Sequence, residues 1–145
     1  MFEKGYFYNL AKEHTEEYIN IECDIIDRTF EDLDHFAEYL IDTIRFEVTD
    51  IDNDEECEKE LDQRRIEIYD YILTECKETI DKAIRVRQLF EVITEDKVVM
   101  DKFNNNIWDL LEELEEATPE ALDAYERLFL TPDEIEAYKQ IYHIS

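Results

Sequence analysis

The longest regular pattern of apolar and polar positions covers residues 54–93, forty residues without proline or glycine. On a helix of about 100° per residue, the apolar side chains of this segment fall within an arc of roughly 160°. They are Leu61, Ile66, Ile68, Tyr69, Ile72, Leu73, Cys76, Ile80, Ala83 and Ile84. Glu67, Glu78, Asp81 and Arg85 lie opposite. Because so wide an arc needs neighbours on two sides, we predict a long central helix against which the N-terminal and C-terminal thirds pack.

A helix over the whole segment would be about 60 Å long at 1.5 Å per residue. That is longer than a compact domain of 145 residues should span. We therefore expect a break at residues 92–96, where β-branched side chains lead into Glu95 and Asp96.

The N-terminal third has one well-defined helix and two ambiguous segments. Residues 19–25 alternate apolar and polar side chains as a half-buried strand would, and residues 44–51 also fit either a helix or a strand. Thr29, with Asp32 three residues later, predicts the start of the helix between these segments. Its apolar face consists of Phe30, Leu33, Phe36, Ala37, Leu40, Ile41 and Ile44.

The C-terminal third carries clear helix boundaries. Residues 98–114 have helical spacing, with three consecutive asparagines at 104–106 as a candidate interruption. Thr118 and Thr131 each precede a proline and so mark helix starts, and Glu134 completes a capping box with Thr131. The single glycine and two prolines leave little turn chemistry for hairpins. We predict a mainly α fold, a single-domain helical bundle over residues 1–145, with an α+β alternative that has a small β element near the N-terminus.

Composition indicates a soluble, cytoplasmic protein. Apolar runs fall short of the roughly 18 residues of a membrane span, and the first residues lack the pattern of a secretory signal. The three cysteines fit neither a disulfide framework nor a zinc site. We expect buried, reduced thiols, no membrane association and no cofactor.

Two acidic pairs fit one enzyme class. Glu55 with Glu58, and Glu78 with Asp81, match the spacing with which an all-helical nucleotide pyrophosphohydrolase would hold Mg²⁺. In a chain with 41 acidic residues such pairs arise by chance. The Mg²⁺-dependent enzyme is therefore a second alternative, and we expect a protein that is not an enzyme.

Other catalytic and metal patterns are incomplete. A di-iron bundle would need two inward-facing Glu-x-x-His pairs, and only Asp32 with His35 comes near this pattern. The histidines have no Ser, Cys or Asp partner at a motif spacing. We predict no catalytic residue and no metal site.

The net charge of −26 is unevenly distributed. Residues 1–58 hold 19 acidic against 4 basic side chains, residues 59–102 hold 11 against 9, and residues 103–145 hold 11 against 2. Like charges at this density oppose folding by self-repulsion, which indicates a purpose other than solubility. The same charge opposes direct binding of nucleic acid and favours a basic protein partner.

Carboxylates at i and i+4 on a helix lie about 6 Å apart along its axis, and several such rows can imitate lines of phosphates. We predict that acidic side chains of three segments bind the partner. They are Glu31, Asp34, Glu38, Asp42, Asp50, Asp52, Asp54, Glu55, Glu56, Glu112, Glu113, Glu115, Glu116, Glu120 and Asp123. Tyr39, Tyr125 and Tyr138 interleave with them and could anchor an interface. Alternatively, the rows are solvated faces and the tyrosines are core edges.

In size, charge and low glycine content the chain resembles the acidic DNA-mimic proteins of phages and mobile elements, of the anti-restriction and anti-CRISPR type. No motif carries the resemblance, so it transfers no site residue. It implies a stoichiometric inhibitor that occupies the basic nucleic-acid-binding surface of a DNA-acting enzyme. The first alternative is an immunity protein that neutralises a basic nuclease toxin. The wide apolar arc could also serve a homodimer.

Overall fold

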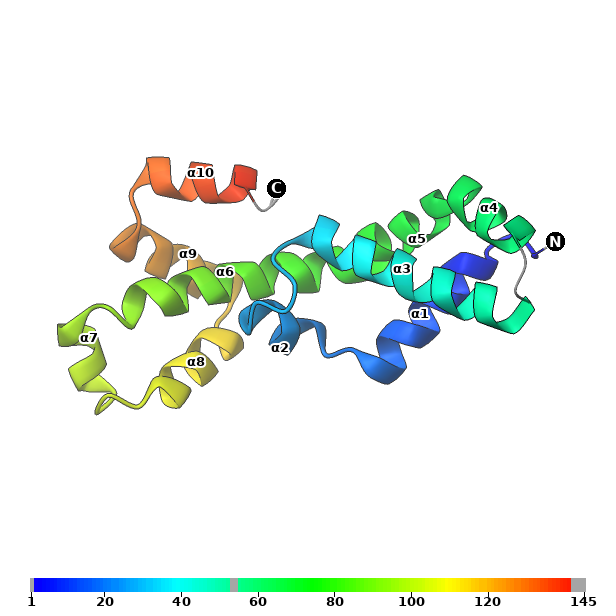
Figure 1. Ribbon diagram of the computed structural model, residues 1–145. Coiled ribbons are helices and arrows are strands. Elements are labelled where there is room, and N and C mark those ends of the chain that lie inside the picture. Colours follow the sequence, from blue (N-terminus) through cyan, green and yellow to red (C-terminus); the bar gives the residue numbers. More distant parts are fainter. Residues whose placement is uncertain (1, 53–54, 142–145) are drawn as a thin grey trace. The chain divides into compact units, whose positions relative to one another are not determined.

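A computed structural model describes residues 2–52 and 55–141, and within them every regular element is a helix (Figure 1). The elements are α1 (Tyr6–Tyr18), α2 (Ile21–Ile26), α3 (Leu33–Asp52), α4 (Glu55–Gln63), α5 (Arg65–Tyr71), the π-helical turn η1 (Ile72–Cys76), α6 (Lys77–Ile93), α7 (Lys97–Lys102), α8 (Ile107–Glu116), α9 (Pro119–Phe129) and α10 (Pro132–Ile141). The mainly α prediction is confirmed.

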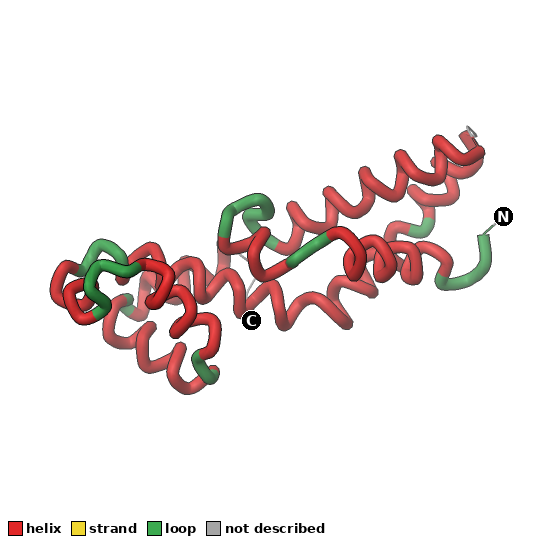
Figure 2. The backbone as a smooth tube through the Cα atoms, turned by 90° about the horizontal axis from the view of Figure 1, so that it is seen from below, coloured by secondary structure: helices red, strands yellow, loops and turns green. Residues whose placement is uncertain are grey.

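Figure 2 shows helices and loops but no strand in the described part of the chain, so the α+β alternative is wrong. Residues 44–51 lie within α3. In the earlier ambiguous segment, the side chain of Asn20 accepts a hydrogen bond from the backbone N–H of Cys23, at 3.2 Å. This cap starts α2, which places the alternating residues on a short helix.

The chain forms two compact units, Met1–Ile80 and Asp81–Ser145. The boundary falls inside α6. Unit 1 contains 25 acidic and 8 basic residues, and unit 2 contains 16 and 7, so the net charges are −17 and −9. That these units behave as a single domain stays a prediction.

In unit 1, α5 packs against α1 and α3, and α3 packs against α4 (Figure 1). The predicted apolar face of α3 is confirmed, because every one of its side chains from Phe30 to Ile44 is buried. Phe7, Ala11, Ile25, Leu61, Ile68 and Ile72 complete the core of this unit. The buried inner face fixes the orientation of the charged outer face of α3.

The predicted start of α3 at Thr29 is wrong, because the helix begins at Leu33. Asp32 Oδ1 accepts a hydrogen bond from the backbone N–H of His35 at 2.8 Å, and His35 Nδ1 accepts one from the N–H of Glu31 at 3.1 Å. The first bond satisfies a donor that the first turn of the helix leaves free, and the second connects Glu31, just before the helix, to His35. The Asp32 and His35 pair therefore has a structural role at the helix start.

The predicted central helix has a break that its sequence pattern does not indicate. Arg64 lies between α4 and α5 with φ −113° and ψ 22°. Its guanidinium donates hydrogen bonds to the backbone carbonyls of Phe2, at 2.8 Å, and of Glu3. It also pairs with Glu60 at 2.7 Å and Glu67 at 2.6 Å. Contacts with the distant N-terminal segment thus accompany the break.

The far end of the central helix agrees with the prediction. α6 ends at Ile93, inside the segment 92–96 where we expected a break. Asp96 then caps α7, because its Oδ1 accepts hydrogen bonds from the N–H groups of Val98 and Val99, at 3.0 and 3.2 Å. The β-branched residues therefore predicted this break correctly.

Two side chains of the predicted apolar arc are exposed, Ile66 at 66% and Leu73 at 50%. The break at Arg64 interrupts the regular rotation of α4 before Ile66. The turn η1 holds one residue more than an α-helical turn. An extra residue rotates the remainder of the helix by about 100°. This rotation affects residues after η1; Ile66 and Leu73 lie at one edge of the predicted arc, whereas Ile72 lies nearer its centre and is fully buried.

In unit 2, the predicted interruption at the asparagines is confirmed. Asn104 and Asn105 have φ angles of 55° and 58°, a left-handed conformation that asparagine tolerates better than most residues. The Asn106 side chain caps α8 by accepting from the N–H of Trp108 at 3.1 Å. The loop therefore follows from the side-chain chemistry of three adjacent residues.

Both predicted Thr-Pro helix starts are confirmed. Thr118 Oγ1 accepts a hydrogen bond from the N–H of Ala121 at 3.2 Å, at the start of α9. Thr131 Oγ1 accepts from the N–H of Glu134 at 3.2 Å and donates to its carboxylate at 3.0 Å, at the start of α10. These caps position α9, whose Asp123 and Glu126 face Arg85 of α6.

Candidate partner-binding surface

The outer face of α3 carries the row of carboxylates that the sequence predicts. Asp34, Glu38 and Asp42 are all exposed and lie one helical turn apart, about 6 Å in axial rise. Glu31, which precedes the helix, is half-buried and lies 3.9 Å from Arg28. The pKa of Tyr69 on α5 is raised by burial and by the charges of Glu38 and Asp34. The negative potential of the row therefore extends to the neighbouring helix.

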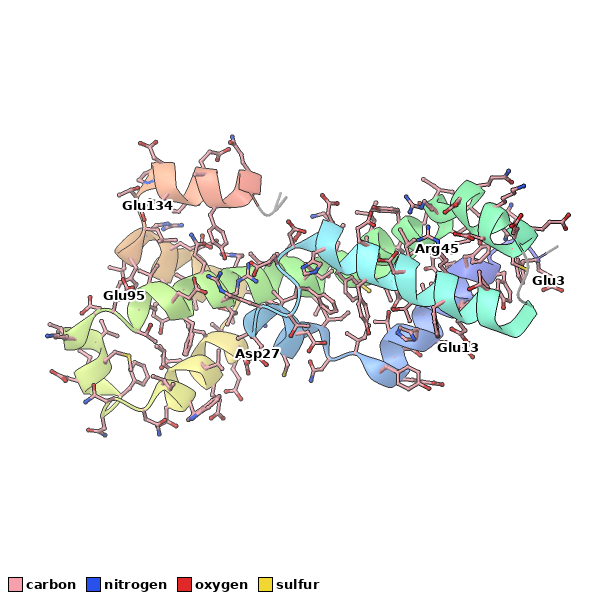
Figure 3. The ribbon with its side chains drawn as sticks, in the orientation of Figure 1. Glu3, Glu13, Asp27, Arg45, Glu95 and Glu134 are labelled. Carbon is pink, nitrogen blue, oxygen red and sulfur yellow. The ribbon has the colours of Figure 1, made fainter. Side chains whose placement is uncertain are left out.

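An ion cluster joins this row to α4. The Arg45 guanidinium lies 3.1 Å from Asp42, 2.8 Å from Asp62 and 3.6 Å from Glu58 (Figure 3). The hydrogen bond with Asp62 and the charges of the three carboxylates raise the pKa of Arg45. Asp62 also lies 3.8 Å from Arg65, so two guanidinium groups among three carboxylates leave a net charge of −1. Glu58 and Asp62 were not predicted as members of this surface, because their ion pairs with Arg45 of α3 depend on helix packing.

The second predicted segment is described only in part. The side chains of Asp50 and Asp52 at the end of α3, and Asp54 as a whole, lie outside the described residues. Glu55 and Glu56 are exposed in the first turn of α4. Negative charge is favourable at a helix N-terminus, which gives these two carboxylates a structural explanation.

In unit 2, the predicted acidic residues lie on α8 and at the start of α9. Five of them, Glu112, Glu113, Glu116, Glu120 and Asp123, are exposed, and Glu115 is half-buried. Glu113 and Asp123 form hydrogen bonds within the unit. Glu113 accepts a hydrogen bond from the Tyr125 hydroxyl at 2.8 Å, and Asp123 accepts one from Arg85 at 2.6 Å.

The three tyrosines named as interface anchors differ in their surroundings. Tyr39 on α3 is 42% exposed. Tyr125 is half-buried, and burial together with its hydrogen bond to Glu113 raises its pKa. Tyr138 is also half-buried, and its hydroxyl donates to the Ile84 carbonyl at 3.3 Å. Tyr39 is thus the best placed of the three to meet a partner.

Five aromatic rings that were not predicted as a group contact one another where α1 meets α3 and the segment before it. We name them the aromatic belt: His14, Tyr18, Phe30, His35 and Tyr39. Ring centroids are 5.2 Å apart for His14 and Tyr18 and 6.3 Å apart for His14 and Tyr39. Phe30 lies 5.0 Å from Tyr39 and 5.7 Å from His35. The spacing within each helix gave no signal of this belt, because it forms only where α1 meets α3.

The described residues contain no group of three or more His, Cys, Asp or Glu side chains that could hold a metal ion. Glu55 and Glu58, one of the two pairs considered for Mg²⁺, are exposed on α4, and Glu58 pairs with Arg45. An open hollow of about 480 Å³ lies along the same helix, lined by Glu56, Lys59, Glu60, Gln63 and Arg64. None of the helices within residues 2–52 and 55–141 has the length and apolar character to cross a membrane.

Comparison of the chain with protein-family models, with curated proteins and with solved structures found no match. The function therefore has to be inferred from the charge and geometry of the chain's own surface.

Proposed function

We propose that the protein is an acidic inhibitor that binds the basic nucleic-acid-binding surface of a DNA-acting enzyme, with its carboxylates in the place of DNA phosphates. The observation that supports this most is the exposed row of Asp34, Glu38 and Asp42, continued by the Arg45 cluster. It belongs to a unit with a net charge of −17. Such a surface attracts a basic groove and repels nucleic acid.

The charge density is of the right order for this role. One row on α3 places a carboxylate about every 6 Å, whereas one DNA strand places a phosphate about every 3.4 Å along the helix axis. A single row is thus about half as dense as a strand. Glu58 and Asp62, held beside Asp42 by Arg45, place further carboxylates at the end of the row.

The row is also presented by a rigid element. Phe36, Leu40 and Ile44 on the inner face of α3 are fully buried. A partner therefore meets carboxylates on a fixed backbone, and less ordering cost opposes binding than for a disordered acidic tail. This supports an inhibitor that acts as a folded protein.

The alternative is an immunity protein that binds one basic nuclease toxin through a local patch. The aromatic belt favours this alternative, because exposed tyrosines next to carboxylates are typical of a specific protein interface. The two functions differ in whether DNA competes for the partner.

Affinity capture from a bacterial lysate near ~0.15 M salt, with and without excess duplex DNA, tests the proposal. One variant combines Asp34→Asn, Glu38→Gln and Asp42→Asn. A matched variant on α8 removes the same charge through Glu112→Gln, Glu113→Gln and Glu116→Gln. Circular dichroism verifies that both variants fold.

We expect the wild-type protein to capture DNA-binding enzymes that are lost when DNA is added. The α3 variant should lose them, and the α8 variant should keep most of them. A single partner that is indifferent to DNA would favour the immunity protein. Failure to capture any nucleic-acid-binding protein would contradict both functions.

A further inference from the structure

The aromatic belt is an exposed surface with a rigid base. Tyr18 is 72% exposed and Tyr39 is 42% exposed. Phe30 is only 3% exposed and contacts Tyr39 on one side and the fully buried Phe36 on the other, at centroid distances of 5.0 and 5.2 Å. Large aromatic side chains this exposed, yet connected to the core, are typical of interface anchors.

Exposed carboxylates occur on both helices that carry the belt. Glu38 adjoins Tyr39 in sequence, and Asp42 lies three residues after it, which places Asp42 on the same side of α3. Glu13 and Glu17 are exposed on α1 beside His14 and Tyr18, and Figure 3 labels Glu13. Aromatic faces and negative charge thus occur together within one unit.

We propose that the aromatic belt and its flanking carboxylates form a docking site for arginine side chains of the protein partner. A guanidinium is planar, stacks on an aromatic ring and can bond a carboxylate through two N–H groups at once. A lysine ammonium supplies the charge without the planar fork. The combination of ring and carboxylate therefore selects arginine over lysine, which a row of carboxylates alone would not do.

Charge complementarity favours an arginine side chain at this docking site over a second copy of the chain or an apolar partner. A second copy of the chain would bring another unit of net charge −17 against the same surface, so repulsion opposes self-association there. An apolar partner would partly desolvate the exposed carboxylate of Glu38 without supplying a cation to it. A cationic side chain with a flat face satisfies both parts of the surface.

The inference deepens the proposed function and rests on it for the identity of the partner. Its test uses two fluorescent peptides of equal length and charge, an oligoarginine and an oligolysine, with binding followed by anisotropy near ~0.15 M salt. The belt variant combines Tyr18→Leu and Tyr39→Leu, which keep apolar bulk and remove the rings. The control is Trp108→Leu, because Trp108 in unit 2 is also 72% exposed.

We expect the wild-type protein to bind oligoarginine about five-fold more tightly than oligolysine, in the range of a cation–π contact at a partly exposed site. The belt variant should lose most of this preference and keep its affinity for oligolysine. The Trp108 control should retain the preference. Each of three results would overturn the inference. They are equal affinities of the wild-type protein for both peptides, a preference for oligoarginine that survives in the belt variant, and a preference lost only in the control.

A measurement on the wild-type protein removes dependence on the variants. Arginine side-chain protons of the peptide should shift upfield in proton NMR spectra when they lie over tyrosine rings, and shifts confined to backbone protons would contradict the site.

Failures of the two proposals are distinguishable. If capture is sensitive to DNA but arginine is not preferred, only the docking site is wrong; if arginine is preferred but DNA does not compete, the proposed function is wrong.

Discussion

Arg85 on α6 should be essential to the stability of unit 2, although the sequence pattern places it on an outer face. Its Nε donates to Glu126 at 2.8 Å and its Nη2 to Asp123 at 2.6 Å. Burial opposes the charge of Arg85, but the hydrogen bonds and charges of these two carboxylates outweigh it, so the pKa of Arg85 is raised. The Glu126 side chain is 8% exposed and that of Asp123 is 51% exposed.

These exposures give different expected costs for each partner. Arg85→Met keeps most of the aliphatic packing and leaves the Glu126 carboxylate buried without its cation, for which we expect a loss of about 3 kcal/mol in the free energy of unfolding. Asp123→Asn removes an exposed pair and should cost about 0.5 kcal/mol. Arg127→Met is the matched control, because Arg127 is exposed on the same helix as Glu126 and should cost less than about 0.5 kcal/mol.

The assay is urea unfolding followed by circular dichroism at ~222 nm, with hydrogen exchange of residues 81–141 to localise the effect. Adding Glu126→Gln to Arg85→Met should restore about 1 kcal/mol, because the unpaired charge is then removed. Lost packing of the arginine stem would give no such rescue. An Arg85→Met protein as stable as the Arg127→Met control, or a double variant without rescue, would refute the reasoning.

Four further predictions concern the fold. Asn105→Val should cost about 1 kcal/mol because φ is positive there, whereas Asn105→Gly should change the stability by less than about 0.5 kcal/mol; thermal unfolding checks both. Burial raises the pKa of Tyr71, so the folded state holds its proton more tightly than the unfolded state; stability should fall as pH rises past the ordinary value of 10.0, and less steeply in Tyr71→Phe. The expectation of buried thiols is wrong for Cys23, which is exposed, so a thiol reagent should modify Cys23 quickly and the two buried cysteines only on unfolding. Raising salt from low concentration to ~0.3 M should raise the melting temperature by screening repulsion, and a flat or falling response would contradict the inferred crowding of charge.

Local sequence signals predicted much of this fold. Thr118, Thr131 and Asn106 cap helices through atoms of adjacent residues, so their roles can be read from the sequence alone. The buried face of α3 follows from a regular helical repeat without an interruption. In such segments the pattern and the structure depend on the same nearby residues.

Features that depend on distant residues could not be predicted in this way. The break between α4 and α5 lies at Arg64, which binds carbonyl groups about sixty residues earlier in the chain. The misplaced start of α3 is a local exception, because Asp32 and not Thr29 caps the helix by accepting from the N–H of His35. Each of these features changes the phase or the boundary of a helix without altering its local propensity.

The same division applies to the candidate surface. The row of Asp34, Glu38 and Asp42 follows from helical spacing and is exposed as predicted. Its connection to Glu58 and Asp62 through Arg45 depends on the packing of α3 against α4. Periodicity within one helix can therefore identify a charged face, but it cannot identify which neighbouring residues extend that face.

If the protein occupies the DNA-binding surface of an enzyme, it must displace DNA from that enzyme. The most direct measurement uses a DNA-binding enzyme recovered by affinity capture, bound to a fluorescent duplex whose anisotropy is followed as the protein is added. We predict a fall to the value of free duplex near one equivalent of protein, with a weaker fall for the variant that neutralises Asp34, Glu38 and Asp42. Unchanged anisotropy, while the protein still binds the enzyme and DNA together, would contradict the claim.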